Sequence, residues 1–82
     1  MTGYAPHPAV RDAAKTLEEY ATARGGEAQV FWAPLGAVVL TDNEVYEVYT
    51  YGSVGYKPEI IIQSRDMDQA DGWRDITRNV LQ

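Results

Sequence analysis

The chain has 82 residues, a formal net charge of −5 and no cysteine. This length fits a single domain, 1–82, and a hydrophobic fraction of 45% is enough for a small core. The lack of cysteine excludes disulfides and thiolate chemistry, and the negative charge disfavours direct binding to a nucleic-acid backbone. No apolar run approaches the roughly 20 residues of a membrane helix and no secretion leader is recognisable, so we expect no membrane partner and a cytoplasmic location.

The first predicted element is a helix. Residues 1–7 precede it as an expected flexible lead-in, because Gly3 and Pro6 disfavour regular structure. Pro8 can occupy the first helical position, and Gly25-Gly26 ends the pattern. Between them, apolar residues recur at steps of three and four and form one stripe: Val10, Ala13, Ala14, Leu17, Tyr20 and Ala21.

The middle of the chain changes to short β-branched and aromatic runs separated by turn residues, which is typical of an antiparallel meander. The predicted turns are Pro34-Leu35, Asp42-Asn43 and Gly52-Ser53-Val54-Gly55. Positive φ angles are expected at Asp42-Asn43, because a two-residue hairpin commonly needs them. The four predicted strands are Ala28–Ala33, Ala37–Thr41, Glu44–Tyr51 and Tyr56–Ser64.

A second helix is predicted to close the chain. Asp66 followed by Gln69 resembles a capping box, and the apolar spacing continues to Val80. Gly72 interrupts this pattern, so the helix could instead start near Asp71. The sequence therefore predicts an α+β fold with the order helix, four-stranded antiparallel meander, helix (α-β-β-β-β-α).

Alternation along the strands divides the sheet residues into two sets. The set predicted to face the core is Phe31, Val38, Leu40, Val45, Tyr49, Tyr51, Tyr56, Ile60 and Ile62, with Gln29 and Glu47 as polar members. The second set is Val30, Trp32, Ala37, Val39, Tyr46, Val48 and Ile61, with a polar rim of Thr41, Glu44, Thr50, Lys57, Glu59 and Gln63. A buried Glu47 needs compensation, so we expect it near a sheet edge or paired with an arginine or a tyrosine hydroxyl.

Two arrangements of the helices remain open. If both stack on one face of the sheet, the second set is an exposed apolar patch with a polar rim, which is the anatomy of a protein contact surface. If each helix covers one face, the second set is ordinary core.

No catalytic or metal-binding constellation is visible. His7, the single histidine, lacks an orienting carboxylate, and Ser53 and Ser64 lack the flanking glycines of a nucleophile elbow. Asp66 and Asp68 match a calcium loop only up to its third position. We therefore expect no enzymatic activity, no metal and no cofactor.

The negative charge is concentrated in the predicted strands. Residues 1–26 carry three acids and three bases, residues 27–64 carry five acids and one base, and residues 65–82 carry four acids and three bases. No Lys or Arg occurs at 25–56, so the aromatic residues there lack the basic groove that nucleic-acid binding requires. The cluster of Asp42, Glu44 and Glu47 favours either edge protection or attraction to a basic site on a partner.

These features favour a small, acidic, non-enzymatic protein that binds a larger protein with a basic site. One subclass is a phage-type inhibitor of a nucleic-acid-handling host system, of the anti-CRISPR or DNA-mimic kind. The alternatives are a homodimeric structural or assembly subunit and, third, a small-ligand-binding domain. The predicted partner-binding residues are Trp32, Val39, Asp42, Glu44, Tyr46, Glu47, Glu59 and Ile61.

Overall fold

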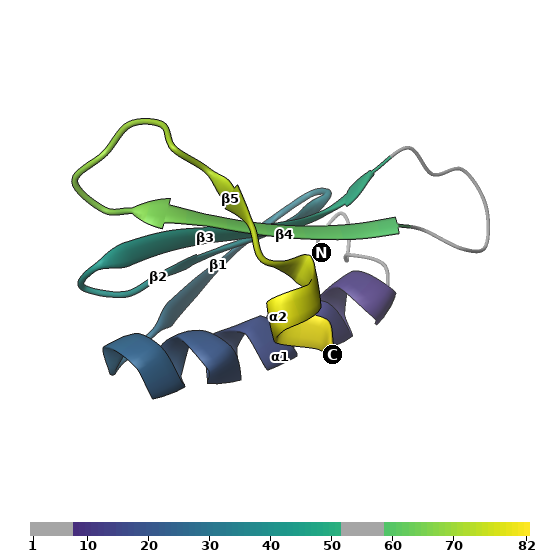
Figure 1. Ribbon diagram of the computed structural model, residues 1–82. Coiled ribbons are helices and arrows are strands. Elements are labelled where there is room, and N and C mark those ends of the chain that lie inside the picture. The colour runs from purple at the N-terminus through teal and green to yellow at the C-terminus, as the bar shows by residue number, and fades with distance from the viewer. Residues whose placement is uncertain (1–7, 52–58) are drawn as a thin grey trace.

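The computed structural model describes residues 8–51 and 59–82 (Figure 1). The strands form one antiparallel sheet in the order β1-β2-β3-β4-β5, which confirms the α+β class and the meander and adds a short fifth strand. The predicted lead-in 1–7 and the predicted turn at 52–55 lie outside the described residues. The elements are α1 (Pro8–Gly25), β1 (Gln29–Ala33), β2 (Gly36–Leu40), β3 (Glu44–Tyr51), β4 (Glu59–Asp66), β5 (Arg74–Asp75) and α2 (Thr77–Leu81).

Helix α1 ends where the sequence predicts. Gly26 follows it with a φ of +88°, a conformation that costs glycine little because it has no β-carbon. The Gly26 N–H donates to the Thr22 carbonyl at 3.0 Å and satisfies one of the last helical acceptors.

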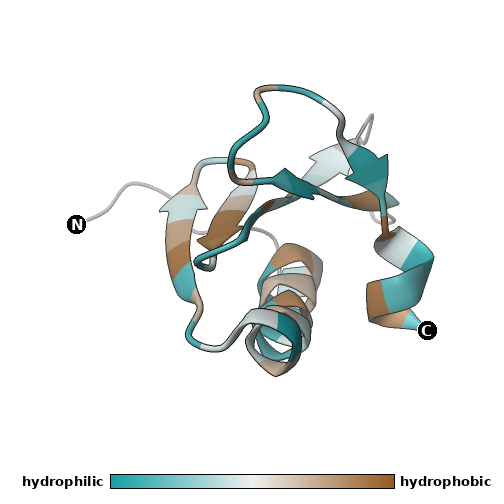
Figure 2. Ribbon diagram, turned by 60° about the vertical axis from the view of Figure 1, so that its left-hand side comes forward, coloured by the Kyte–Doolittle hydropathy of each residue, from teal (hydrophilic) through white to brown (hydrophobic). Residues whose placement is uncertain are grey.

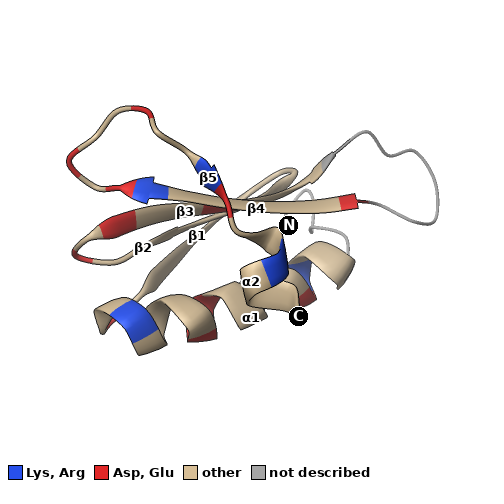
Figure 3. Cartoon of the chain, in the orientation of Figure 1, with Lys and Arg blue, Asp and Glu red and all other residues tan. Residues whose placement is uncertain are grey.

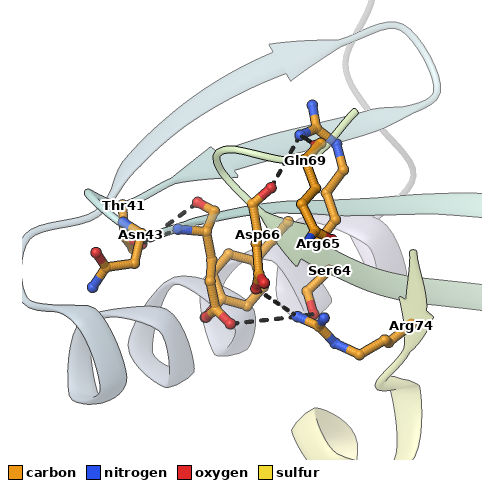
Figure 4. A network of polar contacts seen from close by, with 9 residues as sticks. Thr41, Asn43, Ser64, Arg65, Asp66, Gln69 and Arg74 are labelled. Carbon is orange, nitrogen blue, oxygen red and sulfur yellow. Dashed lines mark hydrogen bonds and ion pairs between the residues drawn. The ribbon is translucent and has the colours of Figure 1, made fainter. Parts of the chain in front are cut away.

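The loop between β2 and β3 closes by a different device from the one expected. The Thr41 N–H donates to the Glu44 carbonyl at 3.0 Å, while the Thr41 hydroxyl accepts the N–H groups of Asn43 at 3.3 Å and Glu44 at 3.1 Å (Figure 4). Positive φ occurs at no non-glycine residue of the described chain, so the expectation for Asp42-Asn43 is wrong. In a type I′ or II′ turn the Thr41 carbonyl would accept the Glu44 N–H, and here the Thr41 hydroxyl accepts it instead.

Both helices pack on the same face of the sheet, as the side view shows (Figure 2). We call this the covered face and the opposite one the open face. No helix of the described chain lies over the open face. The core between α1, α2 and the covered face consists of Ala13, Ala14, Leu17, Ala21, Ala37, Val39, Tyr46, Val48, Ile62 and Val80.

The covered face is not the one predicted to be core. Val39, Tyr46 and Val48 lie beneath α1, whereas Val38 and Tyr49 lie on the open face. The separation of β1, β2 and β3 residues into two sets is correct, and only the choice of face is wrong. Both sets are apolar in these strands. The set predicted to be core contains Glu47 in the middle of the central strand, where a carboxylate is more stable near solvent, whereas Glu44 of the other set lies at the end of that strand.

The register of β4 also differs from the prediction. Tyr51 pairs with Glu59, three positions later than the start of the predicted fourth strand. Because this displacement is an odd number, every β4 residue shares a face with the β3 residues that were expected on the opposite face. Ile60 and Ile62 therefore belong to the covered face, and Ile61 belongs to the open face.

The C-terminal helix is shorter than predicted, and no helix begins at Asp66 or near Asp71. Residues 67–73 form a turn in which Gly72 has a φ of +91°, a conformation outside the right-handed helix. The chain then pairs with β4 as β5, and only Thr77–Leu81 is helical.

Candidate protein-binding surface

The open face of the sheet is an apolar surface with a few polar side chains. Phe31 on the edge strand β1 is 50% exposed, and most of the other apolar side chains are half-buried although no helix covers them. The strand register places on this face the apolar residues Phe31, Val38, Leu40, Val45, Tyr49 and Ile61 and the polar residues Gln29, Glu47, Gln63 and Arg65.

This surface is hollowed beside the turn between β1 and β2. The concavity has a volume of about 480 Å³, and Leu35 in its wall is 71% exposed. Gly36 brings the turn close to β3, because a β-carbon at this position would lie 2.0 Å from the Val48 carbonyl oxygen. We call this concavity the apolar groove. Side chains in its wall include Pro34, Leu35, Val38, Glu47 and Tyr49.

Glu47 is the acidic side chain of the groove. Its carboxylate accepts a hydrogen bond from the Gln63 side-chain amide at 3.0 Å, and no ion pair of the described residues involves it. Glu47 lies on the central strand β3, so the expectation of an edge position or an arginine or tyrosine partner is wrong. A half-buried carboxylate with a neutral partner retains its capacity to attract a cation.

The opposite end of the open face is occupied by Arg65 and Trp73. The Arg65 guanidinium lies 5.1 Å from the centre of the Trp73 ring and donates to the Asp66 and Gln69 carbonyls. The bond from Arg65 to the Gln69 carbonyl ties the turn after β4 to the sheet (Figure 4). Arg65 is thereby engaged within the fold.

A third cluster is acidic and lies where the β2–β3 and β4–β5 loops approach the end of α1. Arg74 bridges the Glu44 carboxylate at 3.5 Å and the Asp66 carboxylate at 3.4 Å (Figure 4). Asp42 and Asp68 are exposed beside them in a cleft of about 520 Å³. Figure 3 shows acidic residues in both of these loops. In the described part of the chain, no three His, Cys, Asp or Glu residues lie close enough to hold a metal ion.

Tyr46 and Val39 cannot serve as contact residues in this structure, because they are 1% and 0% exposed. The Tyr20 ring packs edge-on against the Tyr46 ring with a centroid distance of 6.4 Å, and the Tyr46 hydroxyl donates to the Glu44 carboxylate. Burial raises the pKa of the Tyr46 hydroxyl above its ordinary value, and the bond to Glu44 raises it further. Tyr46 is therefore a core residue with a satisfied polar end.

Trp32 is 54% exposed but lies on the other side of the sheet from the apolar groove. It stands at the outer edge of the covered face, in a concavity of about 600 Å³ between β1 and the flank of α1. Among the other predicted contact residues, Glu47 and Ile61 lie on the open face and the exposed Glu59 begins β4.

The predicted contact residues therefore divide among the core, the outer edge of the covered face, the acidic cluster and the open face. Sequence reasoning missed the groove residues Leu35, Val38 and Tyr49. One signal could have found them. Glu47 alternates with Tyr46 and Val48 along the central strand, and a carboxylate is more stable near solvent than in the core, so the face that carries Glu47 is the better candidate for the open one.

Among residues 8–51 and 59–82, no helix has both the length and the apolar character needed to cross a membrane. Comparisons of the chain with models of known protein families, with curated proteins and with solved structures found no match.

Proposed function

We propose that this chain is a small, non-enzymatic protein-binding domain that receives a partner protein on the open face of its sheet. The observation that carries the proposal is the apolar groove beside the β1–β2 turn, on a sheet face that no helix of the described chain covers. An exposed apolar concavity with a polar border is characteristic of protein contact surfaces. The groove is open rather than enclosed, which suits a protruding side chain of a protein better than a small ligand.

The chemistry of the groove defines the partner segment. Leu35, Val38 and Tyr49 offer an apolar contact, and Glu47 offers a carboxylate with no cationic partner among the described residues. A complementary segment therefore presents an apolar side chain next to a lysine or arginine.

The acidic cluster contributes less to the attraction of a basic partner than its number of carboxylates implies. Glu44 is engaged by the Tyr46 hydroxyl and by Arg74, and Asp66 is engaged by Arg74. Asp42 and Asp68 remain exposed and can attract a basic partner during encounter. An inhibitor of a nucleic-acid-handling system would be one member of this class, and the net charge of −5 is the observation that bears on it.

The test replaces groove residues and measures binding to an identified partner. Capture on immobilised protein identifies partner candidates, and surface plasmon resonance then gives their rate constants. Leu35→Lys should raise the dissociation constant roughly tenfold or more, because it removes an apolar contact and adds a charge in the groove. Glu47→Gln keeps an acceptor for Gln63 but removes the negative charge, so it should slow association and weaken its salt dependence.

Leu81→Lys is the matched control, because Leu81 is an exposed leucine outside the groove. This variant should bind as the wild type does. Equal binding by wild type, Leu35→Lys and Leu81→Lys would refute the groove as the contact site.

A further inference from the structure

The edge strand β1 presents unpaired backbone groups on its outer side. β1 pairs only with β2 within the described chain, and the pairing is continuous from Gln29 to Ala33. Ala33 and Gly36 flank a two-residue turn, so they form a hydrogen-bonded pair. In an antiparallel ladder every second residue bonds to the neighbouring strand, so Phe31 also bonds to β2. The N–H and C=O groups of Val30 and Trp32 therefore point away from the sheet.

The opposite edge of the sheet is closed. The Ile62 N–H donates to the Thr77 hydroxyl at 2.9 Å, and the Ile62 carbonyl accepts the Ile76 N–H at 2.9 Å. β5 pairs with the same strand at Gln63 and Ser64. Within residues 8–51 and 59–82, Thr77 and β5 occupy the opposite edge at Ile62–Ser64, so the β1 edge offers the longer run of outward backbone groups to another strand.

Nothing in β1 itself discourages such pairing. Although the chain has 19 charged residues, counting 12 acids and 7 bases, none lies at 28–41, and Figure 3 shows this hairpin without charge. Proteins usually protect an edge strand with a charge, a proline or a bulge, and β1 has none of these within its length. Pro34 limits any added strand to the five residues of β1.

We propose that β1 pairs antiparallel with β1 of a second copy of this chain, joining two sheets into one of ten strands. A two-fold axis at Phe31 places Val30 of one copy opposite Trp32 of the other, and this register uses every outward backbone group of the strand. It also stacks the half-exposed Phe31 side chains directly across the axis on the open face. An uncharged, self-complementary edge favours a second copy over a charged peptide as the occupant.

The flank of α1 next to the edge supports this occupant. The charged residues that line the concavity beside Trp32 are Arg11, Asp12, Lys15 and Glu18. The flank therefore carries two basic and two acidic side chains, so two copies of it related by the two-fold axis do not bring a net charge of one sign together. The interface therefore combines backbone bonding and aromatic contact without repulsion between the flanks of the two helices.

Sedimentation equilibrium from about 1 µM to about 1 mM covers the range in which a small interface associates. We expect a reversible monomer–dimer equilibrium for the wild type. Phe31→Lys should raise the dimer dissociation constant roughly tenfold or more, because two like charges would face each other at the axis. Leu81→Lys, which makes the same change in charge at another exposed apolar residue, should leave the constant unchanged.

A mixing experiment tests the register itself. Phe31→Lys and Phe31→Glu should each be monomeric but should associate when mixed, because only pairing of residue 31 with residue 31 turns repulsion into attraction. Hydrogen exchange at the Val30 and Trp32 amides should slow as the wild-type concentration rises.

The proposal is overturned if the wild type stays monomeric at about 1 mM, or if Phe31→Lys dimerises like the wild type. It is also overturned if the edge amides are protected only by an extended segment of a different protein. These measurements use the isolated protein, so they stand or fall independently of partner binding at the groove.

Discussion

Tyr46 illustrates how a single buried polar group makes stability depend on pH. Its hydroxyl is held neutral by burial and by the bond to Glu44, which raise its pKa above the ordinary value of 10.0. The folded state therefore keeps a proton that the unfolded chain loses above that pH. This contribution to stability is complete below about pH 10 and is lost progressively as the pH rises towards the higher pKa of the folded state.

We expect the free energy of unfolding to fall above about pH 10 with a slope from Tyr46 approaching roughly 1.4 kcal/mol per pH unit. Tyr46→Phe cannot ionise and should show a flatter profile, although it loses the bond to Glu44. Urea unfolding at a series of pH values measures the difference. Parallel profiles for the two proteins would mean that Tyr46 ionises as readily in the folded chain as in the unfolded one.

Gly36 is required for steric reasons rather than for its φ angle. A β-carbon there would lie 2.0 Å from the Val48 carbonyl oxygen, a backbone atom that cannot move without opening the β2–β3 pairing. We expect Gly36→Ala to destabilise the fold by about 2 kcal/mol or more. Thermal unfolding should then occur at a melting temperature lower by about 10 °C.

Gly26→Ala is the comparison for that experiment. Nothing lies within 4 Å of a β-carbon at Gly26, but its φ of +88° is unfavourable for alanine. This variant should lower the free energy of unfolding by about 1 kcal/mol, because alanine is strained at this φ angle although no atom is in its way. A Gly36→Ala variant no less stable than Gly26→Ala would show that the strands separate without cost.

Among the elements, α2 stabilises the sheet through a side chain rather than through its length. The Thr77 hydroxyl accepts the Ile62 N–H and donates to the Asp75 carboxylate at 2.7 Å. The Asp75 carboxylate also accepts the Thr77 N–H at 2.9 Å, and these two bonds hold the pKa of Asp75 below its ordinary value. The five helical residues are thus fixed to the β4 edge at their first position.

We expect Thr77→Val to destabilise the protein by about 1–3 kcal/mol, because the N–H of the fully buried Ile62 loses its acceptor while the side-chain shape is kept. Thr16→Val is the control, because the Thr16 hydroxyl donates only to the Asp12 carbonyl on the exposed side of α1. Urea unfolding measures both variants. Equal stability of the two would indicate that water replaces the Thr77 hydroxyl at the sheet edge.

At the scale of the whole molecule, the sequence determines the order of the elements better than their packing. Glycine and proline mark the ends of α1 and the first turn, and the bounds of β3 are those predicted. The face that α1 covers could not be chosen from apolarity, because Val38 and Val39 are equally apolar neighbours. The residue that distinguishes the two faces is Glu47, because a carboxylate on the central strand is more stable near solvent.

The candidate site was predicted less well for the same reason. The sequence predicts Val39 and Tyr46 on a contact surface, but both lie in the core. Ile61 lies on the open face, as predicted, because the wrong choice of face and the wrong register of β4 cancel for that residue. The pairing of Tyr51 with Glu59 depends on the length of the connection between β3 and β4, and local residue preferences do not determine that length.

The order of the sheet has a consequence for how the chain folds. Each strand lies beside its neighbours in sequence, so every hairpin closes over a short loop and little chain entropy is lost before pairing begins. Helix α1 precedes in the chain the strands that cover its apolar stripe, so during synthesis its stable docking waits for β2, β3 and β4. A ribosome-bound chain that ends before β4 therefore exposes the stripe of α1, and the release of Ile62 and Val80 from the exit tunnel completes the core.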